Sequence, residues 1–353
     1  MPSKPGPANP TRRARSTEPG ELAILSQVRA RATTKAPGLR LGIGDDCALL
    51  HLRPGEEMAV TTDLSIAGRH FRLDWHPPES IGHRALARGL SDLAAMGARP
   101  LAAFLSLGLP RELTGDVSAS AKSKSAKRTT WLSRFYNGLL SLADRSKTPL
   151  AGGDLAQSPI AVADIVLVGA VPRGRALLRS GARPGHLLYV TGSLGGAAAA
   201  LAKLSALASE SDPLRIPKRL LDSLAPHLYP EPRLAQGLFL QRRRLATAAI
   251  DLSDGLSTDL AHLCQESHVS AELDAVRLPL HPAATLTQAL DGGEDYELLF
   301  AAAPGTHVPR SIAGVPVTCI GRILRRNKSR PAVTLRTAEG SQALKPQGWE
   351  HFS

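Results

Sequence analysis

The sequence predicts a protein of mixed helices and strands, of the α/β or α+β class, that is divided into two domains. Its 353 residues exceed the length of one ordinary compact domain. Strand-like and helix-like segments alternate in both halves, which is typical of helices packed on sheets. The composition changes at "RGRALLRSGARPGH", residues 173–186. We therefore expect a tail over residues 1–19, a first domain over 20–172 and a second domain over 173–353.

The start of the chain has a composition unlike that of the rest. Residues 1–20 are rich in proline, polar and free of aromatic side chains, so we expect a disordered basic tail. The next stretch, 21–32, places Leu22, Leu25 and Val28 on one face and predicts a helix.

The remaining segments of the first domain are predicted from apolar runs and from proline and glycine signals. A Ser/Ala/Lys-rich segment at about 115–130 predicts a flexible insert. In order, we expect a strand with its core at 58–62, a helix opened by the prolines at 77–78 and closed by Gly97, a buried strand at 101–110, a helix at 131–146, and strands at 149–154 and 160–172.

The second domain begins with a strand, a glycine-rich turn and a helix over residues 187–204. The same plan recurs over 245–267, and residues 315–324 predict a further strand.

Net charge raises the question of a nucleic-acid partner. The formal charge is +12, but residues 1–20, 111–130 and 321–330 together carry +11 of it. Surfaces that bind single-stranded nucleic acid interleave aromatic side chains with Arg and Lys, whereas aromatic residues make up only 4% of this chain. We therefore expect solvated basic appendages and no nucleic-acid partner. Weak attraction to RNA or to a membrane surface is the alternative that the charge leaves open.

Location is indicated by three further observations. No apolar run approaches the ~20 residues that cross a bilayer, so we expect no membrane association. The basic N-terminus lacks the apolar stretch of a secretory signal. Cys47, Cys264 and Cys319 are odd in number and far apart, which favours a reducing cytoplasm over a disulfide framework.

Six aspartates stand at element ends or at positions where an acid is unusual: Asp46, Asp63, Asp92, Asp154, Asp251 and Asp254. Asp92 is the most informative, because aspartate is unfavourable inside a helix and a buried carboxylate needs a positive partner or a proton. A salt bridge to Arg84 or Arg88 would explain it without a ligand. Taken together, oxygen ligands without clustered His or Cys favour Mg²⁺ or Mn²⁺ beside phosphate groups.

Simpler roles also fit single motifs. An aspartate of "DLSDG" can cap the following helix, and Asp154 after two glycines can be a turn residue. "GSLGG", residues 192–196, can be a plain turn or can bind phosphate through its amides. The chain lacks the Walker A and protein-kinase motifs, and no lysine occurs between Lys35 and Lys122. A polyphosphate ligand would therefore need metal ions and arginines to neutralise it.

Seven motifs occur in the order found in thiamine-monophosphate kinases: "LGIGDDCALL", "TTDLSIAGRHF", "LSDLAAMGARP", "AGGDLA", "GRALLRSGARPGHLLYVTGSLGGAAAAL", "AIDLSDGLSTDL" and "GGEDYELLF". The sequence thus resembles this family, of the superfamily of aminoimidazole ribonucleotide synthetase and selenophosphate synthetase. The resemblance covers about residues 20–352 apart from the insert. It implies an N-terminal ATP- and metal-binding domain, whose sheet pairs with that of a second subunit into a barrel in a homodimer, and a C-terminal α/β domain.

The resemblance also implies an activity and its residues. ATP would phosphorylate thiamine phosphate to thiamine diphosphate by direct in-line transfer with several Mg²⁺ ions and no catalytic base; this is the final step of thiamine diphosphate biosynthesis. The implied metal ligands are Asp46, Thr61, Thr62, Asp63, Asp92, Asp154, Asp251 and Asp254. The implied ATP contacts are Gly153, Asp154, Arg179 and Ser253, and the implied thiamine-phosphate contacts are His70, Glu294 and Trp349.

The sequence departs from the family pattern after the GGD motif. Leu155 and Ala156 stand there, where the family usually has threonines, so a hydroxyl contact is lost. Among enzymes the runner-up is another ATP-using member of the superfamily. Selenophosphate synthetases typically carry a reactive Cys or selenocysteine in a Gly-rich N-terminal segment, and residues 20–40 contain no cysteine.

Overall fold

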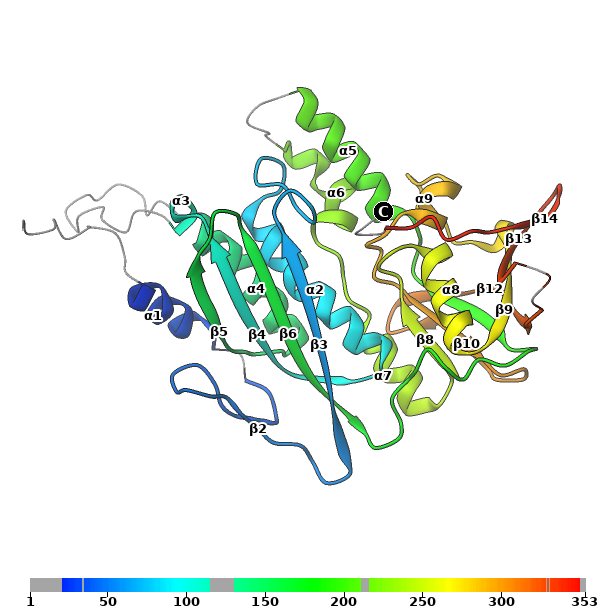
Figure 1. Cartoon of the computed structure of the whole chain (residues 1–353), viewed down its shortest axis with the longest axis horizontal. Helices are drawn as coiled ribbons and strands as arrows, with labels where there is room; N and C mark the ends of the chain where they lie inside the picture. Colours follow the sequence, from blue (N-terminus) through cyan, green and yellow to red (C-terminus); the bar gives the residue numbers. More distant parts are fainter. Residues whose placement is uncertain are drawn as a thin grey trace, which may run out of the picture.

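Two sheets with helices packed on them make up the protein (Figure 1). The computed structural model describes residues 21–33, 35–114, 130–210, 216–327, 329 and 331–349. The tail expected at 1–19 and nearly all of the insert expected at 115–130 lie outside these residues. The expectation of a mixed helix and strand fold is confirmed. Within the described ranges, no helix combines the length and the apolar character that crossing a bilayer requires.

The first sheet has four strands in the order β3–β6–β4–β5. The β4–β5 pair is parallel and the other two pairs are antiparallel. Its strands are β3 (Glu56–Ile66), β4 (Arg99–Leu109), β5 (Leu150–Gln157) and β6 (Val162–Pro172). The other elements of this half are α1 (Glu21–Arg31), β1 (Leu39–Leu41), β2 (Leu49–Leu50), α2 (Pro78–Ala95), α3 (Arg111–Thr114) and α4 (Trp131–Ser146).

The two faces of this sheet are covered differently. Helices α2 and α4 cover one face, and their apolar side chains form a continuous core with those of the sheet (Figure 1). On the opposite face, Leu50 and Leu52 pack on part of the sheet. Along the edge strand β3, the outward side chains Met58, Val60 and Leu64 are 50%, 57% and 46% exposed. Met58, Val60 and Leu64 therefore form an apolar strip on the sheet that is exposed and could pack against another surface.

Helix α2 is held by backbone contacts as well as by side chains. A methyl group at Gly138 of α4 would lie 1.8 Å from the carbonyl oxygen of Glu79. A methyl group at Gly237, in α7 (Leu234–Arg243), would lie 1.9 Å from the carbonyl oxygen of Ala94. Only glycine allows two backbone segments to approach so closely. Both ends of α2 are therefore fixed by direct contact with neighbouring helices.

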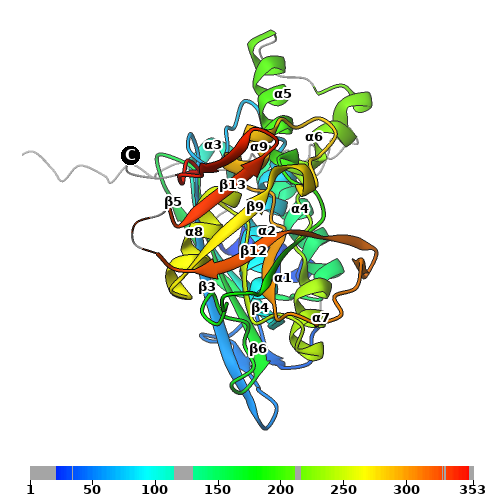
Figure 2. The same cartoon turned by 90° about the vertical axis from the view of Figure 1, so that its right-hand side faces the viewer.

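The second sheet is larger and mostly antiparallel, with strand order β14–β13–β9–β12–β7–β10–β8 and β11 paired to β12 (Figure 2). Its strands are β7 (Leu187–Thr191), β8 (Ala248–Asp251), β9 (Val269–Asp274), β10 (Leu298–Ala302), β11 (Ser311–Ile312), β12 (Val315–Arg325), β13 (Val333–Thr337) and β14 (Gly340–Ala343). The remaining helices are α5 (Gly196–Glu210), α6 (Leu221–Leu228), α8 (Leu256–Glu266) and α9 (Leu286–Asp291).

The second sheet has a core on each face. Helix α8 packs on one face through Leu256, Leu260 and Leu263. On the other face, the end of α2 joins α7 against the sheet, because Ala94 shares a core with Phe300. Helix α2 therefore contacts both sheets, and side chains along it can meet residues of either half.

Two of the predicted strand ends were too early. Asp63 lies inside β3, which continues to Ile66, and Asp154 lies inside β5, which continues to Gln157. Both strands extend because neighbouring strands supply partners for their backbone groups, Ile165 opposite Asp63 and Ser106 opposite Asp154. A single strand's residues do not reveal these partners.

Candidate active site

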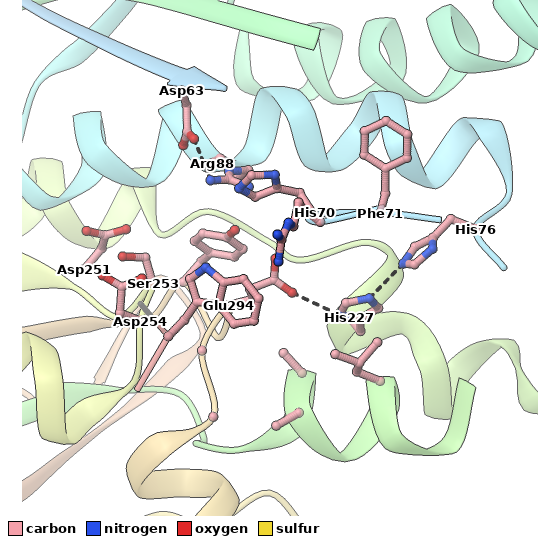
Figure 3. A pocket seen from close by; sticks show the side chains of 18 of the residues that line it. Asp63, His70, Phe71, His76, Arg88, His227, Asp251, Ser253, Asp254 and Glu294 are labelled. Carbon is pink, nitrogen blue, oxygen red and sulfur yellow. Dashed lines mark hydrogen bonds and ion pairs between the residues drawn. The ribbon is translucent and has the colours of Figure 1, made fainter. Parts of the chain in front are cut away.

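A cavity of about 620 Å³ lies between the two halves of the chain (Figure 3). Strand β3, helix α2 and the segment between them line one side, and the loops that follow β8 and α9 line the other. Nine of the residues singled out from the sequence line it: Thr62, Asp63, His70, Asp92, Asp251, Ser253, Asp254, Glu294 and Trp349.

A cluster of acids occupies one end of this cavity. The Thr61 hydroxyl donates a hydrogen bond to Asp92, and the Ser91 hydroxyl donates one to Asp251 Oδ2 at 2.7 Å. Burial raises the pKa of Asp92, and the nearby charge of Asp63 adds to the effect. Burial and the charge of Asp92 raise the pKa of Asp251 to about 7. These carboxyl groups come from both halves of the chain and are close enough to repel one another.

Arginines partly neutralise this cluster, although not through the salt bridges expected from the sequence. Arg88 pairs with Asp63 at 2.6 Å, and Arg84 pairs with Glu294 at 2.5 Å. Neither makes a salt bridge to Asp92, so that simple explanation of the helix-interior acid is wrong. The charge of Arg179 does reach the cluster, because it counteracts the rise in the pKa of both Asp92 and Asp251.

The donor set suits magnesium. Among the described residues, no three Asp, Glu, His or Cys side chains converge closely enough to enclose a metal ion by themselves. Magnesium, however, usually takes one or two carboxylates and completes its shell with water and phosphate oxygens. The charge of Asp63 acts on Asp92 and the charge of Asp92 acts on Asp251, so a divalent cation beside them would relieve the repulsion that raises the pKa values of Asp92 and Asp251.

The "DLSDG" loop is held by an acid outside the motif, which the sequence did not single out. Asp259 Oδ2 accepts hydrogen bonds from the amides of Ser253, Asp254 and Gly255, each at 3.1 Å. Asp259 therefore holds the loop that leads into α8. The N-cap position of that helix is Gly255 and not an aspartate of the motif. Asp251 and Asp254 both line the cavity.

The glycine-rich turn before α5 is a turn and not an open phosphate site. Asp295 Oδ2 accepts from the amide of Gly195 at 2.6 Å, and Oδ1 accepts from the amide of Ala197 at 3.2 Å. A protein carboxylate thus occupies the amides that a phosphate would need. Asp295 is used in this contact and is absent from the cavity lining, unlike its neighbour Glu294.

Polar and aromatic side chains form the other end of the cavity (Figure 3). The Ile66 amide donates to His70 Nδ1 at 3.1 Å, so the neutral ring carries its proton on Nε2. Trp349 is 50% exposed, and its backbone amide donates to the carbonyl of Asp254 at 3.1 Å. This bond ties the C-terminal segment to the loop that follows β8.

Three of the residues singled out from the sequence lie away from the cavity: Asp46, Gly153 and Asp154. Asp63 is opposite Ile165, Ile165 is opposite Leu105, and Leu105 is opposite Gly153. Three strand spacings of about 4.8 Å separate these edges of the sheet by roughly 14 Å. Gly153 and Asp154 therefore lie on the far edge.

Asp46 belongs to the same region, because Gly42 of its loop lies against Ala151 at the start of β5. Gly153 also has a structural reason to be glycine. Its φ is +147°, and a methyl group there would lie 1.9 Å from the Leu105 carbonyl oxygen. Within one chain, the predicted residues thus form two separate groups, one at the cavity and one beside β5.

Several cavity residues were not foreseen as parts of a site. They are Arg88, His76, His227, Phe71, Trp75 and Tyr296. Arg88 had a detectable signal, since it stands four residues before Asp92 on the same helix face. The Nε atom of Arg88 is buried and has no hydrogen-bond partner within the described residues. No local sequence pattern marks His76 and His227, because their contacts join one half of the chain to the other.

Comparison with known proteins places this site in a family. The families described as AIR synthase related protein, N-terminal domain and C-terminal domain, match residues 44–171 and 183–329. The thiamine-monophosphate kinase of Escherichia coli (strain K12) is 39% identical over 319 residues, which cover 86% of this chain and 90% of that relative.

Solved structures agree with this match. The crystal structure of thiamine-monophosphate kinase from Stenotrophomonas maltophilia K279a is 36% identical, with a TM-score of 0.73 over 89% of this chain and 96% of that one. The structure described as AaThiL complexed with AMPPCP and TMP is 28% identical, with a TM-score of 0.70 over 94% and 97% of the two chains. The chain therefore belongs to the thiamine-monophosphate kinase family, built from the two AIR synthase related domains.

Proposed function

We propose that this protein is a thiamine-phosphate kinase, which transfers the γ-phosphoryl group of ATP to the phosphate of thiamine phosphate and releases thiamine diphosphate and ADP. One observation carries the proposal in this chain. A single cavity joins an acid cluster around Asp92 to an end lined by His70, Glu294 and Trp349. The similarity to thiamine-monophosphate kinases over most of the chain supports the same activity.

The chemistry needs positioning more than covalent help. The acceptor is a phosphate oxygen that is already ionised at neutral pH, so no side chain has to remove a proton from it. Two anions must approach each other, and transfer proceeds when their repulsion is neutralised and the reacting atoms are in line. Magnesium, when bound, would supply most of that neutralisation.

The proposed roles divide the residues into three sets. The metal ligands are Asp46, Thr61, Thr62, Asp63, Asp92, Asp154, Asp251 and Asp254. The ATP contacts are Gly153, Asp154, Arg179 and Ser253. The thiamine-phosphate contacts are His70, Glu294 and Trp349, where the indole ring would face the positive thiazolium ring in a cation–π contact worth ~0.5–2 kcal/mol.

We also propose that the protein works as a homodimer. The apolar strip of Met58, Val60 and Leu64 is open on the sheet face that α2 and α4 do not cover. The separation of Asp63 from Asp154 is a second reason, because both are proposed to bind metal yet stand at opposite edges of one sheet. A second copy facing this sheet would bring the β5 edge of one protomer to the cavity of the other.

Domain limits and location complete the proposal. The tail is assigned to residues 1–19, the ATP- and metal-binding domain to 20–172 and the C-terminal domain to 173–353, in keeping with the family matches at 44–171 and 183–329. The three cysteines are free thiols. Free thiols and a requirement for ATP favour the cytoplasm.

One assay tests the activity. Purified protein is incubated with ATP, Mg²⁺ and thiamine phosphate, and thiamine diphosphate is measured by chromatography. We expect product that depends on both ATP and Mg²⁺ and that disappears when EDTA is added. Hydrolysis of ATP without thiamine diphosphate would point to another member of the superfamily and would contradict the proposal.

A further inference from the structure

We propose that His76 and His227 are positioning residues that hold Glu294 at the thiamine-phosphate end of the cavity and connect it to the segment carrying His70. The inference rests on the proposed function, because it concerns how that site is kept in shape. Neither histidine belongs to the motifs that carried the family resemblance.

The two histidines form a continuous path to Glu294 (Figure 3). His76 lies between β3 and α2, and His227 lies on α6, 151 residues later. Their Nε2 atoms are 2.9 Å apart, and His227 Nδ1 is 3.2 Å from Glu294 Oε2. The path therefore starts in the first half of the chain and ends on the loop after α9.

The neighbouring groups assign the proton on each ring. Glu294 is ionised and can only accept, so His227 carries its proton on Nδ1, 3.2 Å from Glu294 Oε2. His227 Nε2 is then an acceptor, and His76 donates to it from Nε2. His76 Nδ1 accepts from the Arg72 amide at 3.1 Å and lies 3.2 Å from the Arg72 carbonyl, which accepts from the His76 amide. Arg84 Nη1 lies 3.1 Å from His227 Nδ1 and donates to the His227 carbonyl. Each hydrogen bond from Arg72 to Glu294 thus has one donor and one acceptor.

Arg84 completes the arrangement around the carboxylate. Its Nη2 atom donates to Glu294 Oε1 at 2.5 Å, and its Nη1 atom donates to the carbonyl oxygen of His227 at 2.5 Å. Both carboxylate oxygens of Glu294 are therefore bound, one by the arginine and one by the histidine. Burial alone would raise the pKa of Glu294, but Arg84 and His227 outweigh it and hold the pKa well below its usual range.

Burial makes this series sensitive to the loss of any member. His76 is 4% exposed and His227 is 2% exposed, so the loss of a partner leaves a buried polar atom without its hydrogen bond. Burial, with the charge of Arg84, lowers the pKa of His76 to about 3. The ring therefore stays neutral. Without the His76 N–H, the buried Nε2 of His227 would lack a donor, and its ring would lose the restraint that directs Nδ1 at Glu294.

The same contact connects two parts of the cavity wall. His76 Nδ1 holds the amide of Arg72, and Arg72 directly follows Phe71 in the segment that lines the cavity. The pair therefore couples the position of that segment to the position of Glu294. Both are proposed to contact thiamine phosphate, whereas the acid cluster proposed to bind metal and ATP lies at the other end (Figure 3).

Steady-state kinetics tests the pair. His76→Leu should raise the KM for thiamine phosphate roughly two- to tenfold, the effect of one buried hydrogen bond. The KM for ATP and kcat should stay within about twofold, because the acid cluster is untouched. His76→Gln should restore most of the loss, since its terminal amide can donate to His227 in place of the ring.

His83 supplies a matched control. It is 3% exposed, lies on α2, and its Nε2 contacts the Pro230 carbonyl at 2.8 Å across the same boundary between the two halves. It does not line the cavity. His83→Leu should lower the melting temperature and leave the KM for thiamine phosphate near that of the wild type. If His76→Leu and His83→Leu raise the KM for thiamine phosphate equally, His76 acts only through the stability of the fold and the inference is overturned.

A double-mutant cycle checks that His76 acts through Glu294. In the Glu294→Gln background, His76→Leu should change the KM for thiamine phosphate by less than about twofold. A full, independent effect in that background would also overturn the inference. Nitrogen-15 NMR of the imidazole rings adds a readout without turnover: Nε2–H is expected for His76 and Nδ1–H for His227, and the opposite tautomers would refute the series.

The outcomes separate the two proposals. If the wild-type protein makes no thiamine diphosphate, both the proposed function and this inference are refuted. A wild-type protein that is active, with His76→Leu unchanged in KM, refutes the inference alone.

Discussion

Replacing Arg84 with methionine should lower the free energy of unfolding by about 3–5 kcal/mol, because it leaves a largely buried carboxylate without its cation. The Arg84 side chain is 4% exposed, and that of Glu294 is 24% exposed. Methionine fills a similar apolar volume, so the loss of packing is small. The effect therefore reports on the ion pair and not on a cavity.

The magnitude is set by the contacts that are lost. Breaking a buried ion pair from one side costs ~3–5 kcal/mol, and the partial exposure of Glu294 favours the lower end. Arg84 also donates to the carbonyl oxygens of His227 and His70. Each of these bonds contributes ~1 kcal/mol, which brings the total back toward the middle of the range.

Arg145 offers a matched surface control. It pairs with Glu231, but the two side chains are 49% and 55% exposed. Arg145→Met should therefore cost no more than ~1 kcal/mol. Urea unfolding at pH 7.5 without Mg²⁺, followed by circular dichroism, measures both variants against the wild type.

The double variant Arg84→Met/Glu294→Gln distinguishes charge from shape. It should recover at least half of the stability lost in Arg84→Met, because no buried ionised group remains. If Arg84→Met costs no more than Arg145→Met, or if the double variant recovers nothing, the reasoning about this ion pair is refuted.

Three further predictions concern the acids, the C-terminal tryptophan and pH. Asp92→Asn should reduce turnover more than tenfold, a loss above ~1.4 kcal/mol. Its circular dichroism should stay native and its melting temperature without Mg²⁺ should not fall, and a rate above a tenth of wild type would contradict the metal assignment. Trp349→Ala should raise the KM for thiamine phosphate several-fold and leave that for ATP nearly unchanged, and unphosphorylated thiamine should not be a substrate; equal damage to both KM values would argue against the assignment. Burial lowers the pKa of His83 to about 4, so the unfolded chain takes up a proton below the ordinary value of 6.5 while the folded chain does not. Wild type should therefore lose about 2 kcal/mol of stability relative to His83→Gln between pH 8 and pH 5, measured by urea unfolding at both pH values; a constant difference would show that His83 titrates normally.

The cavity acids were accessible to sequence reasoning because local patterns mark them. Asp92 shares one face of a helix with Ala85, Gly89 and Met96, and an acid among such neighbours indicates an unusual environment. Asp251 and Asp254 follow a strand within one short motif. Each signal lies within a few neighbouring residues, which is the range over which helix and strand periodicity operate.

Contacts between distant segments could not be predicted in the same way. Arg84 binds Glu294 across 210 residues of sequence, and no local pattern indicates that pairing. Distance within a sheet is equally hidden, because the order β3–β6–β4–β5 separates Asp63 from Asp154 although both belong to the same sheet. Asp259 was missed for another reason: it lies after the motif that it holds, and its carboxylate reaches backward to three amides.

The backbone contacts of α2 determine which substitutions outside the cavity would disturb the charged groups inside it. The helix presents Arg88 and Asp92 to the cavity, while Gly138 and Gly237 bring neighbouring helices against its backbone. Sliding or rotation of α2 would press its carbonyl oxygens against these neighbouring helices. Charges held so firmly need little rearrangement during a reaction. A side chain at either glycine, although both lie outside the cavity lining, would therefore displace the charged groups of α2 as a unit.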